Sequence, residues 1–208
     1  MSAEEGNRKM TKGEKTKQKL FEAAALLFSK YDIDKVTVDT IVEAAGVAKG
    51  TFYLYFESKD ALIASFLFYY VNNVDADYKA HLDSLPSGAT ATDMFLSLIS
   101  KIADVLTGTI GYHRMRIAYR LQLVDDINMD AVKGYNRKLY QMFADVLGRG
   151  IERGEFNTTL SIDTLTKHFV MAIRGLSYEW CIRYPDFDLK EEALAHFRIL
   201  LNGIREAR

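Results

Sequence analysis

The residues from 44 to 56 combine hydrogen-bond donors with a complete absence of acidic side chains. A lysine can donate to phosphate or to a guanine edge, a threonine can meet a base edge or a thymine methyl group, and a tyrosine hydroxyl can reach a phosphate oxygen. A glycine among them lets the start of a helix approach a nucleic-acid backbone with its N–H groups pointing outward. This chemistry favours contact with a polyanion. The residues that provide it are Lys49, Gly50, Thr51, Tyr53 and Tyr55.

Two short helices are predicted to position these side chains. Val36, Thr37 and Ile41 stand where a hydrophobic staple has its first apolar residue, its capping hydroxyl and its second apolar residue, so a helix should begin at Thr37. Gly46 can take the left-handed backbone conformation that ends a helix and turns the chain. A second helix is expected from about residue 48 to residue 54. Two helices that meet across a short glycine turn form a helix-turn-helix.

The stretch from about residue 17 to residue 64 resembles the DNA-binding domain of the tetracycline-repressor (TetR) family of bacterial transcription regulators. The resemblance implies that this domain binds operator DNA and that the chain works as a homodimer. It is carried by Thr37, Ile41, Ala45-Gly46-Val47, Gly50-Thr51, Tyr53, Phe56, Lys59 and Leu62. The predicted DNA-binding residues are Thr37, Lys49, Gly50, Thr51, Tyr53, Tyr55 and Lys59.

The sequence departs from the family pattern at three positions. Ala48 stands where a serine is common, so a helix cap and one inferred phosphate contact are missing. Asp32 replaces a frequent glycine, and aspartate tolerates the left-handed conformation better than most residues do. Lys17 stands where an arginine is usual.

Several of these residues have a second interpretation. Lys59 could be a solvated residue in the first turn of its helix instead of a phosphate contact. Ile41, Phe52 and Leu54 are expected in the core, because so small a domain needs its apolar side chains inside.

Length and charge bound the remainder of the chain. The 208 residues, 49% of them hydrophobic, suffice for one ordinary core or two small ones. The net charge of −1 excludes a protein that coats nucleic acid, so attraction to DNA must come from a local patch. We expect a flexible arm over residues 1–15, a helix-turn-helix domain over 16–62, and a helical ligand-binding and dimerisation domain over 63–208.

Other site chemistries are excluded or unsupported. Cys181 is the only cysteine, so an intrachain disulfide cannot form and a zinc site built from cysteines is excluded. The four histidines lie far apart in sequence, and we expect no metal and no cofactor. The usual hydrolase, metalloprotease and dinucleotide-binding motifs are missing from the sequence, so we expect no enzyme. No apolar span approaches the ~20 residues of a membrane helix, which predicts a cytoplasmic, nucleoid-associated protein without a membrane partner.

The predicted fold is all-α, with an N-terminal three-helix helix-turn-helix domain followed by a helical bundle that dimerises. The last two helices, expected over 161–184 and from residue 188 onward, are apolar over more than one stripe. A second apolar face needs a second partner, so such a pair can build a four-helix bundle with its copy. The predicted interface is Leu165, Phe169, Ile173, Leu176, Leu194, Phe197 and Leu201. The other helices are expected over 16–31, 58–82, 92–106, 112–123 and 127–153.

A dimer of this kind would place its two recognition helices in successive major grooves of a pseudo-palindromic operator. We predict a repressor that a small apolar or aromatic ligand releases from DNA, by favouring a dimer geometry that misplaces those helices. Two alternatives stay open: a DNA-binding dimer that is architectural or regulated by a protein partner, and an enzyme that kept the fold. Aromatic residues at helical spacing suit a core as well as a pocket. The ligand-binding candidates are Phe95, Tyr119, Phe143, His168 and Trp180.

Overall fold

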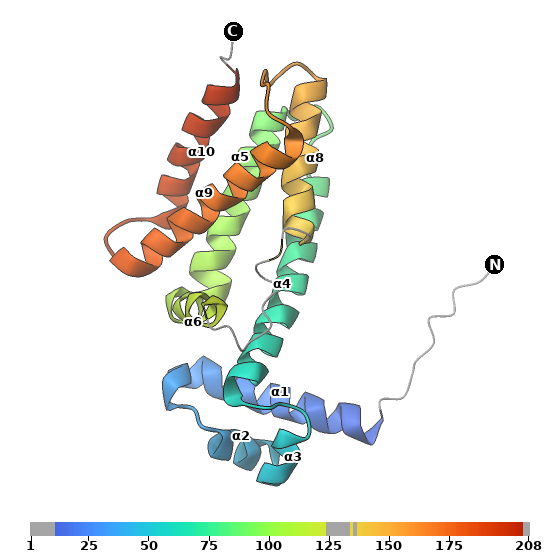
Figure 1. The fold of residues 1–208 in the computed structure, drawn as a ribbon, viewed down its shortest axis with the longest axis vertical. Coiled ribbons are helices and arrows are strands. Elements are labelled where there is room, and N and C mark those ends of the chain that lie inside the picture. The colour runs from blue at the N-terminus through green and yellow to red at the C-terminus, as the bar shows by residue number, and fades with distance from the viewer. Residues whose placement is uncertain (1–10, 124–133, 135–136, 206–208) are drawn as a thin grey trace, which may run out of the picture. The chain divides into compact units, whose positions relative to one another are not determined.

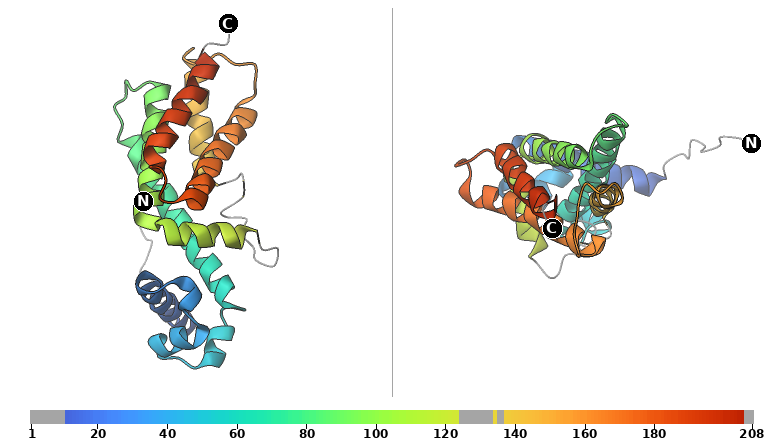
Figure 2. Two further views of the ribbon diagram at one scale, coloured as in Figure 1. Left: turned by 90° about the vertical axis from the view of Figure 1, so that its left-hand side faces the viewer. Right: turned by 90° about the horizontal axis from the view of Figure 1, so that it is seen from above.

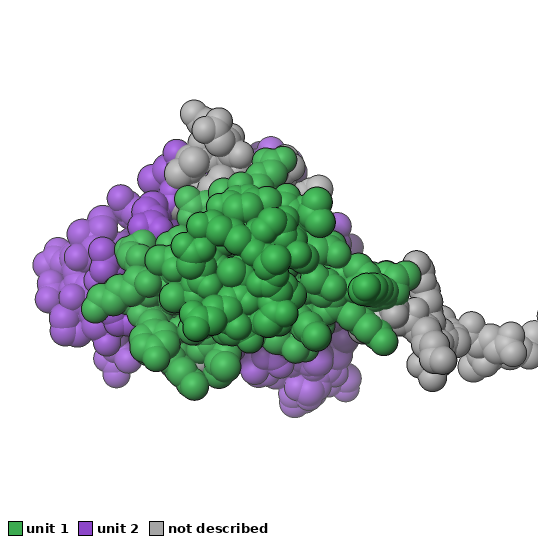
Figure 3. All heavy atoms as spheres, turned by 90° about the horizontal axis from the view of Figure 1, so that it is seen from below, with its two compact units in different colours: residues 1–66 green, residues 67–208 purple. Residues whose placement is uncertain are grey.

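The computed structural model describes residues 11–123, 134 and 137–205, and every regular element within these ranges is helical (Figure 1). This confirms the predicted all-α fold. The chain divides into two compact units, unit 1 (residues 1–66) and unit 2 (residues 67–208), which Figure 3 colours separately. The helix α4 (Lys59–Asp83) contributes residues to both.

Unit 1 begins its described part with a helix that starts earlier than predicted. Besides the start of α4, the unit contains α1 (Lys12–Lys30), the short 3₁₀ turn η1 (Ile33–Lys35), α2 (Val38–Ala45) and α3 (Lys49–Tyr53). The helix start predicted at residue 16 is wrong, because Thr11 and Glu14 form a capping box. The Thr11 hydroxyl accepts from the Glu14 N–H at 3.2 Å, and the Glu14 carboxylate accepts from the Thr11 N–H at 2.7 Å.

A small apolar core holds the helices of unit 1 together. Leu20 of α1, Ile41 of α2 and Phe52 of α3 are fully buried. The ring of Phe56 lies 5.7 Å from that of Phe21 and 5.6 Å from that of Phe52, between centroids. Burying each such side chain contributes about 1.5–3 kcal/mol. Because the buried residues come from three helices, this core fixes the orientation of α3 within unit 1.

Unit 2 is a bundle around α5. Its described part contains the rest of α4, α5 (Ala91–Asp104), the π-helical turn η2 (Val105–Ile110), α6 (Tyr112–Gln122), α8 (Lys138–Glu152), α9 (Ile162–Arg183) and α10 (Leu189–Arg205). The helix α5 packs against α8 and α10, while α9 packs against α6, α8 and α10 (Figure 2). The Phe95 ring of α5 lies 4.8 Å from Phe143, 5.0 Å from Phe169 and 5.8 Å from Phe197, between centroids. These four rings form the centre of the bundle.

Two helix boundaries in unit 2 differ from the predicted ones. The helix expected to end at residue 106 continues through η2 to Ile110, where Gly111 takes a positive φ of 77°. The helix expected from residue 127 begins at Lys138; residues 127–133, 135 and 136 lie outside the described residues. The backbone of Arg137 is extended, and its Nε donates to both carboxylate oxygens of the buried Asp75 at 3.0 and 2.9 Å. This ion pair fixes the point at which α8 starts.

The helix α8 ends at Glu152, next to the predicted end at residue 153. Arg153 caps the helix, Gly154 has a φ of 69°, and Phe156 folds back into the core. The Phe156 ring lies so close to Gly150 that a Cβ at position 150 would stand 2.1 Å from it.

Among the described residues, no helix taken alone has the length and apolar character needed to cross a membrane. The segments 91–110 and 112–120 meet those two criteria only as a pair, and they are bent by 96° where they join.

Candidate nucleic-acid interface

The helix α2 begins and ends where the sequence predicted. The Thr37 hydroxyl accepts from the Thr40 N–H at 3.2 Å, and the Thr40 hydroxyl accepts from the Thr37 N–H at 3.1 Å. Gly46 has a φ of 65°, and its N–H donates to the carbonyl of Glu43 at 3.1 Å. The left-handed turn that the glycine was expected to make is therefore present, and it leads directly into α3.

The helix α3 buries one side and presents the other. Phe52 and Phe56 are buried, whereas Tyr53 is 51% and Leu54 is 80% exposed. The prediction that Leu54 belongs to the core is wrong. Leu54 lies about 200° around the helix from Phe52, so a core that takes Phe52 and Phe56 turns Leu54 outward. The spacing of the two phenylalanines was the signal for this. Ala48 makes no capping hydrogen bond, as its side chain implied.

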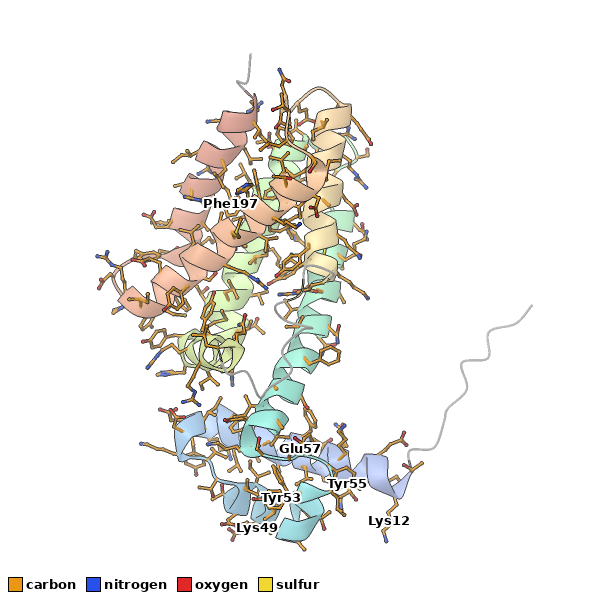
Figure 4. The ribbon with its side chains drawn as sticks, viewed as in Figure 1. Lys12, Lys49, Tyr53, Tyr55, Glu57 and Phe197 are labelled. Carbon is orange, nitrogen blue, oxygen red and sulfur yellow. The ribbon has the colours of Figure 1, made fainter. Side chains whose placement is uncertain are left out.

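The structure brings several of the predicted DNA-binding residues to one side of unit 1. Figure 4 shows Lys49, Tyr53 and Tyr55 along that side, with Lys12 at the N-terminal end of α1. Tyr55 is half-buried, and its hydroxyl lies 3.4 Å from where a Cβ of Gly13 would stand. We call the side of unit 1 that carries Lys49, Tyr53 and Tyr55 the reading surface, and the first turn of α1 borders it. The sequence did not suggest this neighbour, because residues 1–15 were predicted to form a flexible arm.

Lys49 is paired with an acidic residue of α2. Its Nζ donates to Asp39 Oδ1 at 2.7 Å, and both side chains are more than half exposed. The hydrogen bond and the charge of Asp39 raise the pKa of Lys49 above its ordinary value. Lys49 is therefore a cation at any physiological pH.

Gly50 has no structural reason of its own to be glycine. It lies within α3 without a positive φ, and no atom of the described residues stands within 4 Å of where its Cβ would be. Gly46, by contrast, adopts a backbone conformation that side chains disfavour. The space beside position 50 is therefore open, which suits the close approach of a ligand.

Lys59 is used inside unit 1. Its ammonium donates to the carbonyls of Ile33 at 3.1 Å and Val36 at 3.0 Å, so it ties the segment before α2 to α4. These bonds favour a structural role for Lys59 over the predicted phosphate contact.

The predicted ligand-binding residues do not converge on one place. Phe95 and Phe143 are fully buried in the central core of unit 2, in contact with each other. His168 is exposed on α9. Trp180 is buried and Tyr119 half-buried in a second apolar cluster, which also contains Met115, Cys181 and Leu189. Phe95 and Phe143 thus share the central cluster and Tyr119 and Trp180 share the second one, while His168 belongs to neither.

The predicted dimer residues are mostly core residues of the chain itself, and the dimer interface stays a prediction. Leu165, Phe169, Ile173, Phe197 and Leu201 are buried, and Leu176 and Leu194 are partly buried against them. The periodicity showed two apolar stripes on α9 and α10 without showing which one faces inward. We call the other one the outer stripe, and its residues are Met171, Tyr178, Ile182 and Ile199.

Comparison with known proteins identifies the segment that contains the candidate interface. Residues 20–66 match the family described as bacterial regulatory proteins, tetR family. The chain is 24% identical over 189 residues to the HTH-type transcriptional repressor KstR2 of Mycobacterium tuberculosis (strain ATCC 25618 / H37Rv), covering 89% of this chain and 90% of that protein. It is 27% identical over 192 residues to the fatty acid metabolism regulator protein of Bacillus subtilis (strain 168), covering 89% and 93%.

The fold of the whole chain has a counterpart among solved structures. The transcriptional regulator FadR from Bacillus subtilis, solved in complex with stearoyl-CoA, superimposes with a TM-score of 0.71 at 20% identity, covering 90% of this chain and 98% of that one. The matched family segment contains α2, the Gly46 turn and α3, with the exposed Lys49 and Tyr53. Residues 20–66 are therefore the segment of this chain that matches the tetR family of bacterial regulatory proteins, and they carry its helix-turn-helix.

Proposed function

We propose that the chain is a homodimeric repressor that binds a pseudo-palindromic operator through α2 and α3 and leaves it when a small molecule binds unit 2. The observation that carries the DNA-binding part is the outward side of α3. It combines exposed donors with a glycine that nothing inside the chain requires. A backbone that passes close to a phosphate or a base edge would require it.

Each residue of the reading surface has a role in this proposal. Lys49 and Thr51 face base edges, the hydroxyl of Tyr53 meets phosphate, and the exposed Leu54 packs on a thymine methyl group. Thr37 and Tyr55 contact phosphates at the two flanks, and Lys12 extends the second flank. Lys59 is left out, because its donors are used within unit 1.

The partner of the outer stripe is proposed to be a second copy of the chain. Exposed apolar side chains on two adjacent helices can pair with those of a second copy across a two-fold axis, which is the usual symmetry of a homodimer. Met171, Tyr178 and Ile182 on α9 and Ile199 on α10 are large apolar side chains left in solvent by the single chain. Soluble monomers rarely leave contiguous apolar surface of this kind uncovered.

The effector is proposed to be an acyl thioester of coenzyme A. The support is the likeness to the FadR structure that holds stearoyl-CoA. Tyr119 and Trp180 stay candidates for its site, because they share one cluster and Tyr119 is half-buried. A ligand of this class switches the protein only if it binds the DNA-free geometry more tightly than the DNA-bound one.

DNase I footprinting on genomic fragments tests the DNA-binding part. We expect one protected inverted repeat whose affinity falls steeply with salt, since each neutralised phosphate contributes a slope of about −0.9. Tyr53→Ala should weaken binding by about tenfold or more, while Tyr31→Ala, a matched change at an exposed tyrosine after α1, should not. Absence of a protected repeat at every salt concentration, or equal effects of the two variants, would contradict the assignment.

Titration with stearoyl-CoA tests the effector, with coenzyme A and stearate as separate controls. We expect stearoyl-CoA alone to weaken operator binding and to change the fluorescence of Trp180, the only tryptophan. If all three leave operator affinity unchanged, the thioester proposal is wrong and a partner-regulated DNA binder becomes the better description.

A further inference from the structure

The ion pair between Asp39 and Lys49 places a carboxylate on the surface that reads DNA. Asp39 lies in the first turn of α2 and Lys49 is the first residue of α3, so the pair bridges the two helices of the helix-turn-helix. Residues 44–56 contain no acidic side chain, which makes this carboxylate an exception beside them. A negative charge facing a polyanion opposes binding unless it meets a specific donor.

The fold does not explain the pair. Exposed ion pairs contribute little to stability, and both side chains here are more than half exposed. The helices are already held by the buried Ile41 and Phe52, and α2 has its own cap in Thr37 and Thr40. What the pair does achieve is to hold the flexible lysine beside an acceptor at a fixed spacing.

That spacing matches the major-groove edge of one base pair. Lys49 Nζ and Asp39 Oδ1 lie 2.7 Å apart. In a G·C pair the guanine O6 and the cytosine N4 share a hydrogen bond and so lie about 2.9 Å apart. The ammonium can donate to O6 and N7 of guanine while the carboxylate accepts from the N4 amino group of cytosine.

The four base pairs differ in how they meet such a pair of groups. With guanine under Lys49, both contacts form. With thymine there, O4 accepts from Lys49 and adenine N6 donates to Asp39, but the thymine methyl replaces the second acceptor. The two reversed pairs place an amino group against the ammonium and an acceptor against the carboxylate. Both contacts then become repulsive, which is discrimination against the wrong sequence.

We propose that Asp39 is a specificity-determining residue: together with Lys49 it reads the donor and acceptor polarity of one base pair in each half-site and prefers G·C with guanine under Lys49. This inference rests on the proposed DNA-binding function and deepens it. Without Asp39, Lys49 would still attract DNA but would accept either orientation of the pair.

The test starts from duplexes that the full-length wild-type chain selects from a random library. Affinity is then measured for all four base pairs at every half-site position. For the wild type, one position should rank G·C first, T·A second and the reversed pairs last, with a loss of about tenfold or more on reversal. Asp39→Asn should reduce that loss to less than about threefold at this position only, because an amide can donate as well as accept. Binding to unrelated DNA should rise.

Two further variants make the result specific. Glu43→Gln removes the same charge one turn along α2 and should leave the ranking of base pairs intact. If it changes the ranking as much as Asp39→Asn does, Asp39 acts only through its negative charge and the proposal is overturned. Lys49→Gln should weaken the guanine preference at the same position. Circular dichroism and thermal unfolding of each variant check that the fold is kept.

The outcomes separate this inference from the proposed function. If the wild type selects no sequence, the DNA-binding proposal fails and this one fails with it. If it selects an inverted repeat but Asp39→Asn keeps the full wild-type ranking, only the role of Asp39 is overturned.

Discussion

A glycine at position 50 stands inside a short helix, where alanine would favour the helical conformation by up to about 1 kcal/mol. Neither the backbone nor the packing of unit 1 needs this glycine, since its Cβ position is open. The glycine at position 46, four residues earlier, has a positive φ and is needed by the turn. The fold therefore requires glycine at position 46 and does not require it at position 50.

Substituting each glycine by alanine should give opposite results. Gly50→Ala is expected to leave unfolding unchanged or to stabilise it by about 0.4–1 kcal/mol, while lowering operator affinity. Gly46→Ala is expected to destabilise the chain by about 1–2 kcal/mol. Thermal unfolding and operator titration of both variants check this. Full operator affinity in a folded Gly50→Ala protein would remove the close approach that we assign to this position.

Lys59 distinguishes a structural residue from a DNA contact. Lys59→Met should destabilise the chain by about 1–3 kcal/mol, because two carbonyls in the segment before α2 lose a charged donor. Urea unfolding measures the change, and operator titration at a temperature where the variant is fully folded measures its effect on binding. Unchanged stability with weakened DNA binding would restore the phosphate contact that the sequence suggested.

Among the helices, the end of α8 shows how the residues after a helix can restrict the side chains within it. The chain reverses at Gly154 and returns Phe156 onto Gly150, leaving no room for a side chain at position 150. Gly148, half a turn earlier, is also buried, but a Cβ there would stand 3.5 Å from Ile162 Cδ1, an ordinary contact. One buried glycine in α8 is therefore required by packing and the other is not.

Alanine at these two positions tests that distinction. Gly150→Ala should destabilise unit 2 by about 1–3 kcal/mol through overpacking against Phe156. Gly148→Ala should be neutral or slightly stabilising, because alanine favours a helix and fits the available space. Chemical unfolding of the two variants gives the comparison. Equal stabilities would mean that Phe156 can move aside without cost.

The helices could be predicted because their signals are local. Apolar periodicity, the Thr37 cap and the glycine at position 46 each act within a few residues. The start of α1 was predicted too late, because the surrounding lysines suggested a flexible arm. The spacing of Thr11 and Glu14, which form a capping box, was a signal in the sequence for the correct start. The extended Arg137 could not be foreseen, because its partner Asp75 lies 62 positions away.

For the candidate sites, the sequence suggested which side chains suit contact with DNA, but it did not show which side chains contact other parts of the same chain. Lys49, Thr51 and Tyr53 could be predicted as DNA contacts from their chemistry and remain predictions, whereas only the folded structure shows the bonds of Lys59 within unit 1. On α9 and α10 the period revealed two apolar stripes, but only packing shows that Phe169 and Phe197 point inward.

At the scale of the whole molecule, the outer stripe is the feature that the single chain leaves unexplained. Ile199 is 70% and Ile182 is 60% exposed, although both are large and apolar. The four central phenylalanines of unit 2 contact one another within this chain and include no residue of the outer stripe. A change on the outer stripe should therefore affect pairing and leave folding intact.

Charged substitutions on this stripe should separate the two copies. Ile199→Glu and Tyr178→Glu are each expected to weaken the dimer by at least about 2 kcal/mol, since each would bury an unpaired carboxylate at the interface. Leu160→Glu, an equivalent change at an exposed leucine before α9, is the control. Sedimentation velocity reports the oligomeric state and circular dichroism the fold. Unchanged sedimentation of both outer-stripe variants would refute this interface.

The packing of unit 2 bears on how the regulator would sense its own abundance. Because α9 and α10 pack against each other within one chain, we expect a newly made copy to fold before it pairs in the proposed dimer. Pairing is then a second-order encounter between finished subunits, and its extent rises with their concentration. Operator occupancy would then rise more steeply than in proportion to the number of copies of the chain, so a modest change in expression would produce a larger change in repression.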